Sequence, residues 1–264
     1  MNDILDVMLA DESFSVIFQP IFDITGERAE LWAVEALTRG PRGTHFESAS
    51  VLFDYVRLKR DEVRVDRHCC ENAIAAAARL DLQHVMTLNA HASTLERDRT
   101  FPSLVLSACE AAGFPPDRLV IEIVEHVPYF DTVSLRASLT ELRAAGVRLA
   151  VDDLGFGHGN LRMFLDVRPD FVKVERYFVD GCAADADRRI LLRAIQSLAR
   201  DFGTKVIAEG VEQASDLDVI RELGIGLAQG FLLGRPSIHI NPVADLDVAR
   251  AQKEQTCSGK RSFA

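Results

Sequence analysis

Short β-branched runs alternate with amphipathic stretches along most of the chain, and this alternation constrains the fold more than any other feature. The six residues 23–28, which include Thr25-Gly26, join the first two runs and are typical of a hairpin turn. The later connections are long enough to hold helices, with apolar residues at helical spacing over 60–80, 132–145, 187–202 and 214–223. The predicted strands are residues 15–22, 30–37, 84–89, 119–124, 148–152, 171–174, 205–208 and 227–231.

Parallel strands that are separated by helices imply βαβ units around a buried sheet, and eight such strands can close a barrel. We therefore predict a (β/α)8 TIM-like barrel whose first hairpin contributes an antiparallel strand. A doubly wound open sheet is the alternative, but the chain has no G-x-G-x-x-G loop to support a nucleotide-binding version. Residues 1–252 are expected to form this single domain, and residues 253–264 a flexible tail without apolar periodicity.

Composition excludes several other classes of protein. The chain has 40 Asp and Glu against 30 Lys and Arg, a net charge of −10, so no broad basic face for duplex nucleic acid is expected. No apolar run approaches the roughly 18 residues that a membrane span needs. The 5 cysteines show no C-x-x-C spacing, which favours reduced thiols and a cytoplasmic location, and Cys69-Cys70 is expected to pack within a helix.

Polar residues recur where the predicted strands end. Singly, each is explained by a helix cap or a surface charge. Together they are more informative, because the carboxyl ends of barrel strands meet at one rim, where barrel enzymes carry their chemistry. The residues at these positions are Glu35, Asn89, Glu122, Asp152, Asp153, Lys173, Glu209 and Gln229.

The five carboxylates in this set would repel one another, and burying them unpaired would cost several kcal/mol, so a cation is expected between them. Oxygen ligands without cysteine or a histidine pair favour Mg²⁺ or Mn²⁺ over Zn²⁺. Two ions that share Asp152 or Asp153 explain the number of carboxylates, and ion pairs of this kind serve in-line phosphoryl displacement. Lys173 would orient water or stabilise phosphate charge, or form a structural salt bridge. The pattern predicts a metal-dependent phosphodiesterase-like site without naming the substrate.

The same residues lie in segments that resemble the EAL-domain cyclic di-GMP phosphodiesterases. These segments follow the order of the family's motifs over roughly residues 14–240. They are Phe18-Gln19-Pro20-Ile21, Val34-Glu35-Ala36-Leu37-Thr38-Arg39, Leu88-Asn89, Glu122-Ile123-Val124-Glu125, Asp152-Asp153-Leu154-Gly155, Val172-Lys173-Val174-Glu175, Ala208-Glu209-Gly210-Val211-Glu212 and Gln229-Gly230-Phe231.

The resemblance implies hydrolysis of cyclic di-GMP to linear pGpG by in-line attack of a metal-bound water, with two Mg²⁺ or Mn²⁺ ions and inhibition by Ca²⁺. It implies a homodimer, and regulation is expected through dimerisation, a separate protein partner, or metal and substrate levels. Lys173, Glu35, Glu209 and Gln229 would be catalytic, Gln19 and Arg39 would contact the substrate, and Glu125 and Glu212 would anchor loops. The implied metal ligands are Glu35, Asn89, Glu122, Asp152, Asp153 and Glu209.

The chain departs from the family pattern most clearly after Asp153, where Phe156 replaces a small hydroxyl residue. This change motivates the alternative hypothesis of a cyclic di-GMP receptor or partner-binding EAL domain with weak catalysis. Smaller departures are Gly40, His91 and Glu175. We interpret His91 and His158 as loop histidines, because neither has a histidine partner at ligand spacing.

Overall fold

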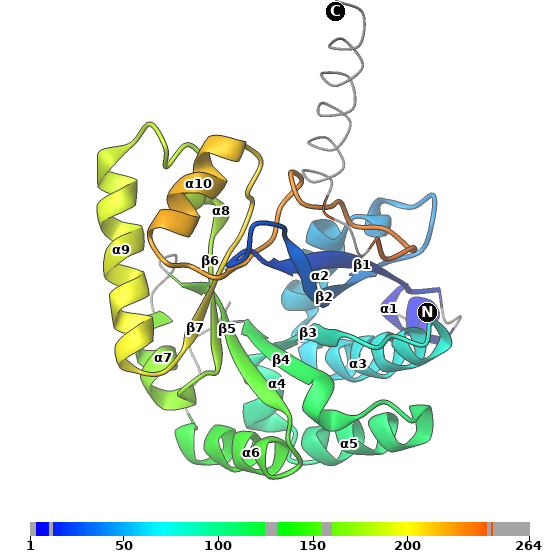
Figure 1. Cartoon of the computed structure of the whole chain (residues 1–264). Helices are drawn as coiled ribbons and strands as arrows, with labels where there is room; N and C mark the ends of the chain where they lie inside the picture. The colour runs from blue at the N-terminus through cyan, green and yellow to red at the C-terminus, as the bar shows by residue number, and fades with distance from the viewer. Residues whose placement is uncertain (1–3, 11–12, 125–130, 155–159, 242–243, 245–264) are drawn as a thin grey trace, which may run out of the picture.

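A computed structural model describes residues 4–10, 13–124, 131–154, 160–241 and 244. Within these residues the strands form one closed barrel, with neighbours in chain order (Figure 1). The strands are β1 (Ser15–Asp23), β2 (Glu30–Arg39), β3 (Val85–His91), β4 (Leu119–Val124), β5 (Arg148–Leu154), β6 (Phe171–Val174), β7 (Lys205–Ala208) and β8 (Leu227–Ala228).

The direction of β1 sets this barrel apart from an all-parallel one. β1 pairs antiparallel with both β2 and β8, and the other neighbours are parallel. The predicted TIM-like barrel with an antiparallel first hairpin is therefore confirmed. β8 is shorter than predicted because the chain turns after Gln229, where the Leu233 amide donates to the Gly230 carbonyl at 3.0 Å.

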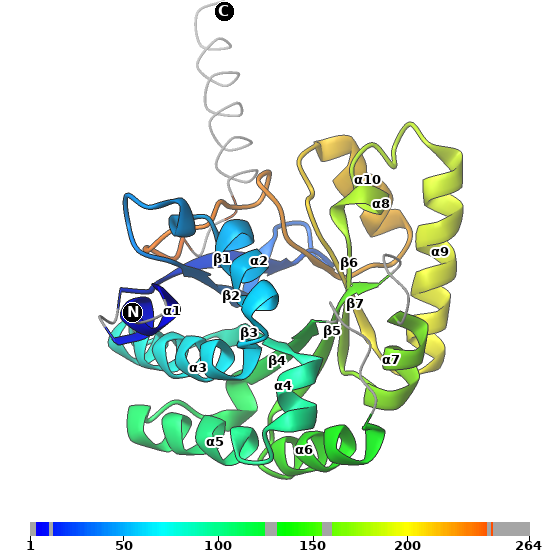
Figure 2. The same cartoon turned by 180° about the vertical axis from the view of Figure 1, so that it is seen from behind.

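The helices lie around the outside of the strands, as the two opposite views show (Figures 1 and 2). No helix among the described residues is long and apolar enough to cross a membrane. The helices are α1 (Ile4–Ala10), α2 (Ala49–Lys59), α3 (Glu62–Arg79), α4 (Ala92–Arg97), α5 (Phe101–Ala112), α6 (Thr132–Ala144), α7 (Asn160–Val167), α8 (Arg176–Val179), α9 (Ala186–Asp201) and α10 (Ala214–Glu222), with 3₁₀ turns at His45–Glu47 and Pro116–Arg118.

The four predicted helices correspond to α3, α6, α9 and α10. α3 starts two residues later than predicted because Arg60 adopts a left-handed conformation, with φ of 56°, and ends α2. Gly146, Gly203 and Gly224 follow three of these helices with φ between 73° and 94°. Positive φ at these positions is what ends a helix at glycine with little strain.

An apolar layer fills the interior of the barrel. It takes one buried residue from each of seven strands, and the partly buried Val85 of β3 packs against it. Because side chains on a strand alternate between two faces, the residue two positions further along points into the barrel as well. The layer consists of Ile21, Ala33, Val120, Ala150, Phe171, Ile207 and Leu227.

On most strands, the next residue that points into the barrel after this layer has a polar side chain. Two residues beyond Ala33 and Val120 the chain has Glu35 and Glu122, and two beyond Phe171 it has Lys173. Asp152, Glu209 and Gln229 follow Ala150, Ile207 and Leu227 in the same way. On antiparallel β1 the matching residue precedes the layer, so Gln19 lies opposite Glu35. The register therefore gathers these side chains at one mouth of the barrel.

The loop after α8 is fixed to α10 by a buried carboxylate. Asp216, 1% exposed, accepts hydrogen bonds from the backbone amides of Gly181 at 3.0 Å and Ala183 at 2.8 Å.

Asp216→Ala leaves both donors without this acceptor, so we expect a loss of about 2–4 kcal/mol in unfolding free energy. Urea titration would measure it, with Asp218→Ala on the exposed face of α10 as a control expected to change stability by less than ~0.5 kcal/mol. Equal midpoints for the two variants would contradict this role.

Candidate active site

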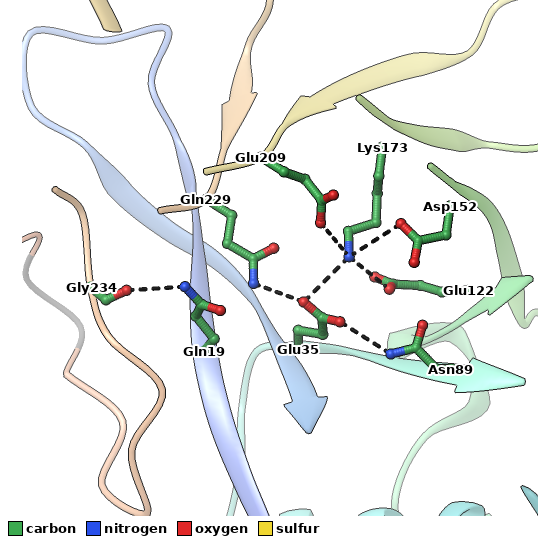
Figure 3. A network of polar contacts seen from close by, with 9 residues as sticks. All are labelled: Gln19, Glu35, Asn89, Glu122, Asp152, Lys173, Glu209, Gln229 and Gly234. Atoms are coloured by element: carbon green, nitrogen blue, oxygen red, sulfur yellow. Dashed lines mark hydrogen bonds and ion pairs between the residues drawn. The ribbon is translucent and has the colours of Figure 1, made fainter. Parts of the chain in front are cut away.

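The ammonium of Lys173 lies at the centre of the polar mouth of the barrel (Figure 3). Its Nζ is 2.7 Å from Glu209 Oε1, 2.9 Å from Glu122 Oε2, 3.3 Å from Glu35 Oε2 and 3.7 Å from Asp152 Oδ1. The Lys173 side chain is only 2% exposed. The structure thus brings together four of the predicted carboxylates, and the salt-bridge interpretation of Lys173 applies to all four.

One ammonium cannot balance four carboxylates, and the pKa values of Glu122 and Glu209 are raised. Burial raises the pKa of Glu122 to about 8, against the opposing effect of the Lys173 charge. Burial likewise raises the pKa of Glu209 well above its usual range. For Lys173, burial lowers the pKa, but the surrounding carboxylates outweigh it and hold the pKa well above the ordinary value. The lysine is therefore a firmly charged ammonium.

Glu35 is held in place by two side-chain amides in addition to the Lys173 ammonium. Its Oε1 accepts the Asn89 side-chain amide at 3.1 Å and its Oε2 accepts the Gln229 amide at 2.8 Å. Burial raises the pKa of Glu35, but the Lys173 charge and these two amides more than compensate, and the net shift is downward. Glu35 is thus held ionised by neighbours from β3, β6 and the end of β8.

The donor set fits a hard divalent cation. The side-chain oxygens Asn89 Oδ1 and Gln229 Oε1 are buried and have no hydrogen-bond partner among the described residues. Both belong to amides whose nitrogens are occupied by Glu35, so each leaves a carbonyl oxygen for another ligand. No group of three or more His, Cys, Asp or Glu within the described part of the chain is arranged to hold a metal ion. The Lys173 ammonium lies between the carboxylates.

A cavity of about 350 Å³ opens beside this cluster. Asn89 and Asp152 line it on the side of the carboxylates, and Arg39 of β2 contributes a guanidinium. Burial lowers the pKa of Arg39, and the Glu35 charge opposes that shift. Gln19, predicted to contact substrate, donates to the Gly234 carbonyl at 3.3 Å on the other side of Glu35 (Figure 3).

The interpretation of His91 as a loop histidine was wrong. His91 is the last residue of β3, is 8% exposed, and lines the cavity. Asp66 of α3 lies 2.9 Å from its Nδ1 and also accepts the His91 amide and the Thr94 hydroxyl, at 2.8 and 2.6 Å. Asp66 stands among buried apolar residues of α3, such as Val65 and Cys70. A carboxylate on the apolar face of a predicted helix is the signal that could have revealed this network.

Other predicted site residues lie apart from the cluster or outside the description. Glu212 pairs with Arg176 at 2.9 Å and belongs to this ion pair and not to the cluster around Lys173. Asp153 belongs to β5, but its side chain lies outside the described residues, as do Glu125 and the loop residues Phe156 and His158. Cys69 and Cys70 are buried, as predicted.

Comparison with known families and proteins gives a consistent result. The family model described as "EAL domain" matches residues 2–236. The oxygen sensor protein DosP of Escherichia coli is 27% identical over 232 residues, which are 86% of this chain and 29% of DosP. The bifunctional diguanylate cyclase/cyclic di-GMP phosphodiesterase MucR of Pseudomonas aeruginosa is 34% identical over 121 residues, 46% of this chain and 18% of MucR. The chain thus spans less than a third of the length of these relatives.

Solved structures agree in fold. A standalone EAL protein from Vibrio cholerae in its c-di-GMP-bound form superposes with a TM-score of 0.78 at 26% identity, over 87% of this chain and 95% of that one. Klebsiella pneumoniae BlrP1, in a manganese/cy-diGMP complex, gives 0.75 at 29% identity over 85% of this chain and 56% of that one. The PaMucR phosphodiesterase in its c-di-GMP complex gives 0.77 at 25% identity, over 88% and 95%.

The central position of Lys173 leads to a stability prediction. Lys173→Met removes the buried ammonium and leaves its carboxylates without a counter-charge, which we expect to lower the unfolding free energy by about 3–5 kcal/mol. Urea titration in the presence of a chelator would measure the loss. Lys205→Met is the matched control, because Lys205 is exposed at the start of neighbouring β7. If the two variants were equally stable, Lys173 would not be the counter-ion of the cluster.

Proposed function

Because the chain belongs to the EAL domain family, we propose that it hydrolyses one phosphodiester bond of cyclic di-GMP and releases linear pGpG, which lowers the level of this second messenger. The observation that carries the proposal is the cluster of four carboxylates around Lys173, beside a cavity of about 350 Å³. Two buried amide oxygens in it have no hydrogen-bond partner within the part of the chain that the structure describes. The c-di-GMP-bound forms of the Vibrio cholerae and PaMucR proteins support the choice of substrate.

Divalent metal ions fit the reaction and the site. Two Mg²⁺ or Mn²⁺ ions bound there would neutralise phosphate charge and acidify a water molecule. The manganese/cy-diGMP complex of BlrP1 supports a divalent ion, and a calcium/cy-diGMP complex of the same protein is consistent with Ca²⁺ as a non-catalytic substitute. The side chains that would hold the ions are Glu35, Asn89, Glu122, Asp152, Asp153 and Glu209.

The protein's own groups have separable tasks in this reaction. Lys173 would hold and polarise the attacking water, since its ammonium donates hydrogen bonds and lies between Glu122 and Glu209. Gln229 would fix Glu35 through its amide nitrogen, which leaves its carbonyl oxygen to orient water. With the water held on one side of the phosphorus, the leaving oxygen departs on the opposite side, as in-line displacement requires.

Binding of the cyclic dinucleotide would use residues at the edge of the cluster. Arg39 lines the cavity next to Asn89 and Asp152, where its fork of donors suits a phosphate. Gln19 lies opposite Glu35 on β1 and would contact the substrate from the other side. Glu125 and Glu212 are proposed to anchor loops, and a homodimer with a separate regulatory partner is proposed for control of activity.

The proposal predicts metal-dependent turnover. With Mn²⁺, the purified chain should convert cyclic di-GMP to pGpG, and a chelator should abolish the reaction. Glu35→Ala removes a carboxylate that contacts Lys173, Asn89 and Gln229, so we expect a fall in kcat/KM of at least about 100-fold. Product would be quantified by chromatography. Glu30→Ala is the control, because Glu30 is exposed at the start of the same strand and should leave turnover unchanged.

Two outcomes would count against hydrolysis. Tight binding of cyclic di-GMP in calorimetry without any product would favour the receptor hypothesis raised by Phe156. Absence of both binding and turnover at every protein concentration would favour a role in protein–protein contact.

A further inference from the structure

Glu209 needs support that the barrel strands do not supply. Glu35 and Glu122 lie inside β2 and β4 and are paired with neighbouring strands on both sides, and Asn89 of β3 is paired with Glu122. Asp152 lies within β5, at a register shift opposite β6. Glu209 comes one residue after the end of β7. Its amide donates to the Val174 carbonyl at 3.0 Å, and the next residue is already outside the ladder.

The side chain of Arg176 covers this segment from outside. Arg176 begins α8, two residues after the end of β6, and its aliphatic stem lies against Gly210. A Cβ built on Gly210 would lie 2.9 Å from Arg176 Cδ and closer still to Cβ and Cγ. Gly210 has φ of 67°, a left-handed conformation that glycine adopts without strain. Glycine at this position therefore permits both the turn and the close approach of the arginine.

The guanidinium of Arg176 holds the same segment at a second point. Its Nη1 lies 2.9 Å from Glu212 Oε1, and its Nη2 lies 3.7 Å from Asp180 Oδ2. Between these points, the amide of Val211 donates to the Gln229 carbonyl at 3.0 Å. The segment that Arg176 holds thus connects the backbones of two site residues, Glu209 and Gln229.

Two cationic side chains from residues 173–176 therefore contact the two ends of residues 209–212. Lys173 reaches into the barrel and contacts Glu209 at 2.7 Å, and Arg176 reaches over Gly210 to Glu212. We propose that Arg176 is a positioning residue for the reaction: it fixes residues 209–212 so that Glu209 presents its carboxylate to the bound divalent ion. This inference rests on the proposed role of Glu209 as a metal ligand. In it, the ion pair between Arg176 and Glu212 serves to position Glu209.

The first test measures Mn²⁺ binding by calorimetry on the whole chain, without turnover. Arg176→Ala should raise the Kd for Mn²⁺ by roughly tenfold or more, the range for residues that orient metal ligands. Arg176→Lys, which keeps a stem and a charge, should restore part of the affinity. Arg64→Ala is the matched control, because Arg64 is similarly exposed and also pairs with two carboxylates, Asp6 and Asp61. It should bind Mn²⁺ like the parent chain.

A double-mutant cycle separates positioning from general damage. Arg176→Met and Glu212→Gln each remove the same ion pair, so the double variant should bind Mn²⁺ no more weakly than the worse single variant. In turnover assays the single variants should lower kcat at saturating Mn²⁺ and leave KM for cyclic di-GMP within about twofold. Additive losses, or Arg176→Ala behaving like Arg64→Ala, would overturn the proposal.

Hydrogen exchange in the metal-free chain keeps the proposal testable even without metal binding. The amides of Glu209 and Val211 should exchange at least about tenfold faster in Arg176→Ala, while amides of Val206 and Ile207 within β7 should not change. Unchanged exchange at residues 209–212 would overturn the proposal. Faster exchange in Arg176→Ala, combined with a parent chain that binds no Mn²⁺, would overturn the metal-dependent function and the role of Arg176 in it, and would show only that Arg176 holds the segment.

Discussion

The buried ammonium of Lys173 is the interaction on which the mouth of this barrel depends. Four carboxylates lie within 4 Å of it, and a single positive charge could not balance the group if all four were ionised. In a low-dielectric interior such an excess costs several kcal/mol unless protons or another cation reduce it. The carboxylates that are costly to ionise in the metal-free protein would therefore attract a divalent ion and, through it, an anionic dinucleotide. The net charge of −10 does not oppose that kind of nucleotide binding.

Much of this site follows from the two-residue period of β-strands. An apolar residue that packs inside the barrel, such as Val120 or Phe171, is followed two positions later by a site residue, Glu122 or Lys173. Strand ends could be located from β-branched runs, and barrel closure then requires these inward positions to converge. For this reason the sequence predicted both the fold and the carboxylate cluster, with three strands matched at both ends and the other limits differing by at most three residues.

Interactions between side chains on separate elements could not be predicted in the same way. Asp66 and His91 are 25 residues apart and meet only because α3 packs against the end of β3. α5 was not predicted, because its run of Leu104, Val105 and Leu106 is as consistent with a buried strand as with a helix. Arg176 carries no signal in the sequence at all, since its role depends on the path of the chain at Gly210.

Whether a site residue lies inside a strand or beyond its end determines how easily a nearby substitution can shift its position. Residues inside strands, such as Glu35 and Glu122, are fixed by ladders on both sides, and substitutions around them affect the barrel itself. Glu209 and Gln229 each lie one residue beyond a strand end and depend on backbone contacts between two loops. Substitutions in those loops could shift a metal ligand by a fraction of an ångström without unfolding the barrel, and shifts of that size alter rates strongly. Of the described site residues, Glu209 and Gln229 are therefore the ones that loop substitutions can move while the strands stay intact.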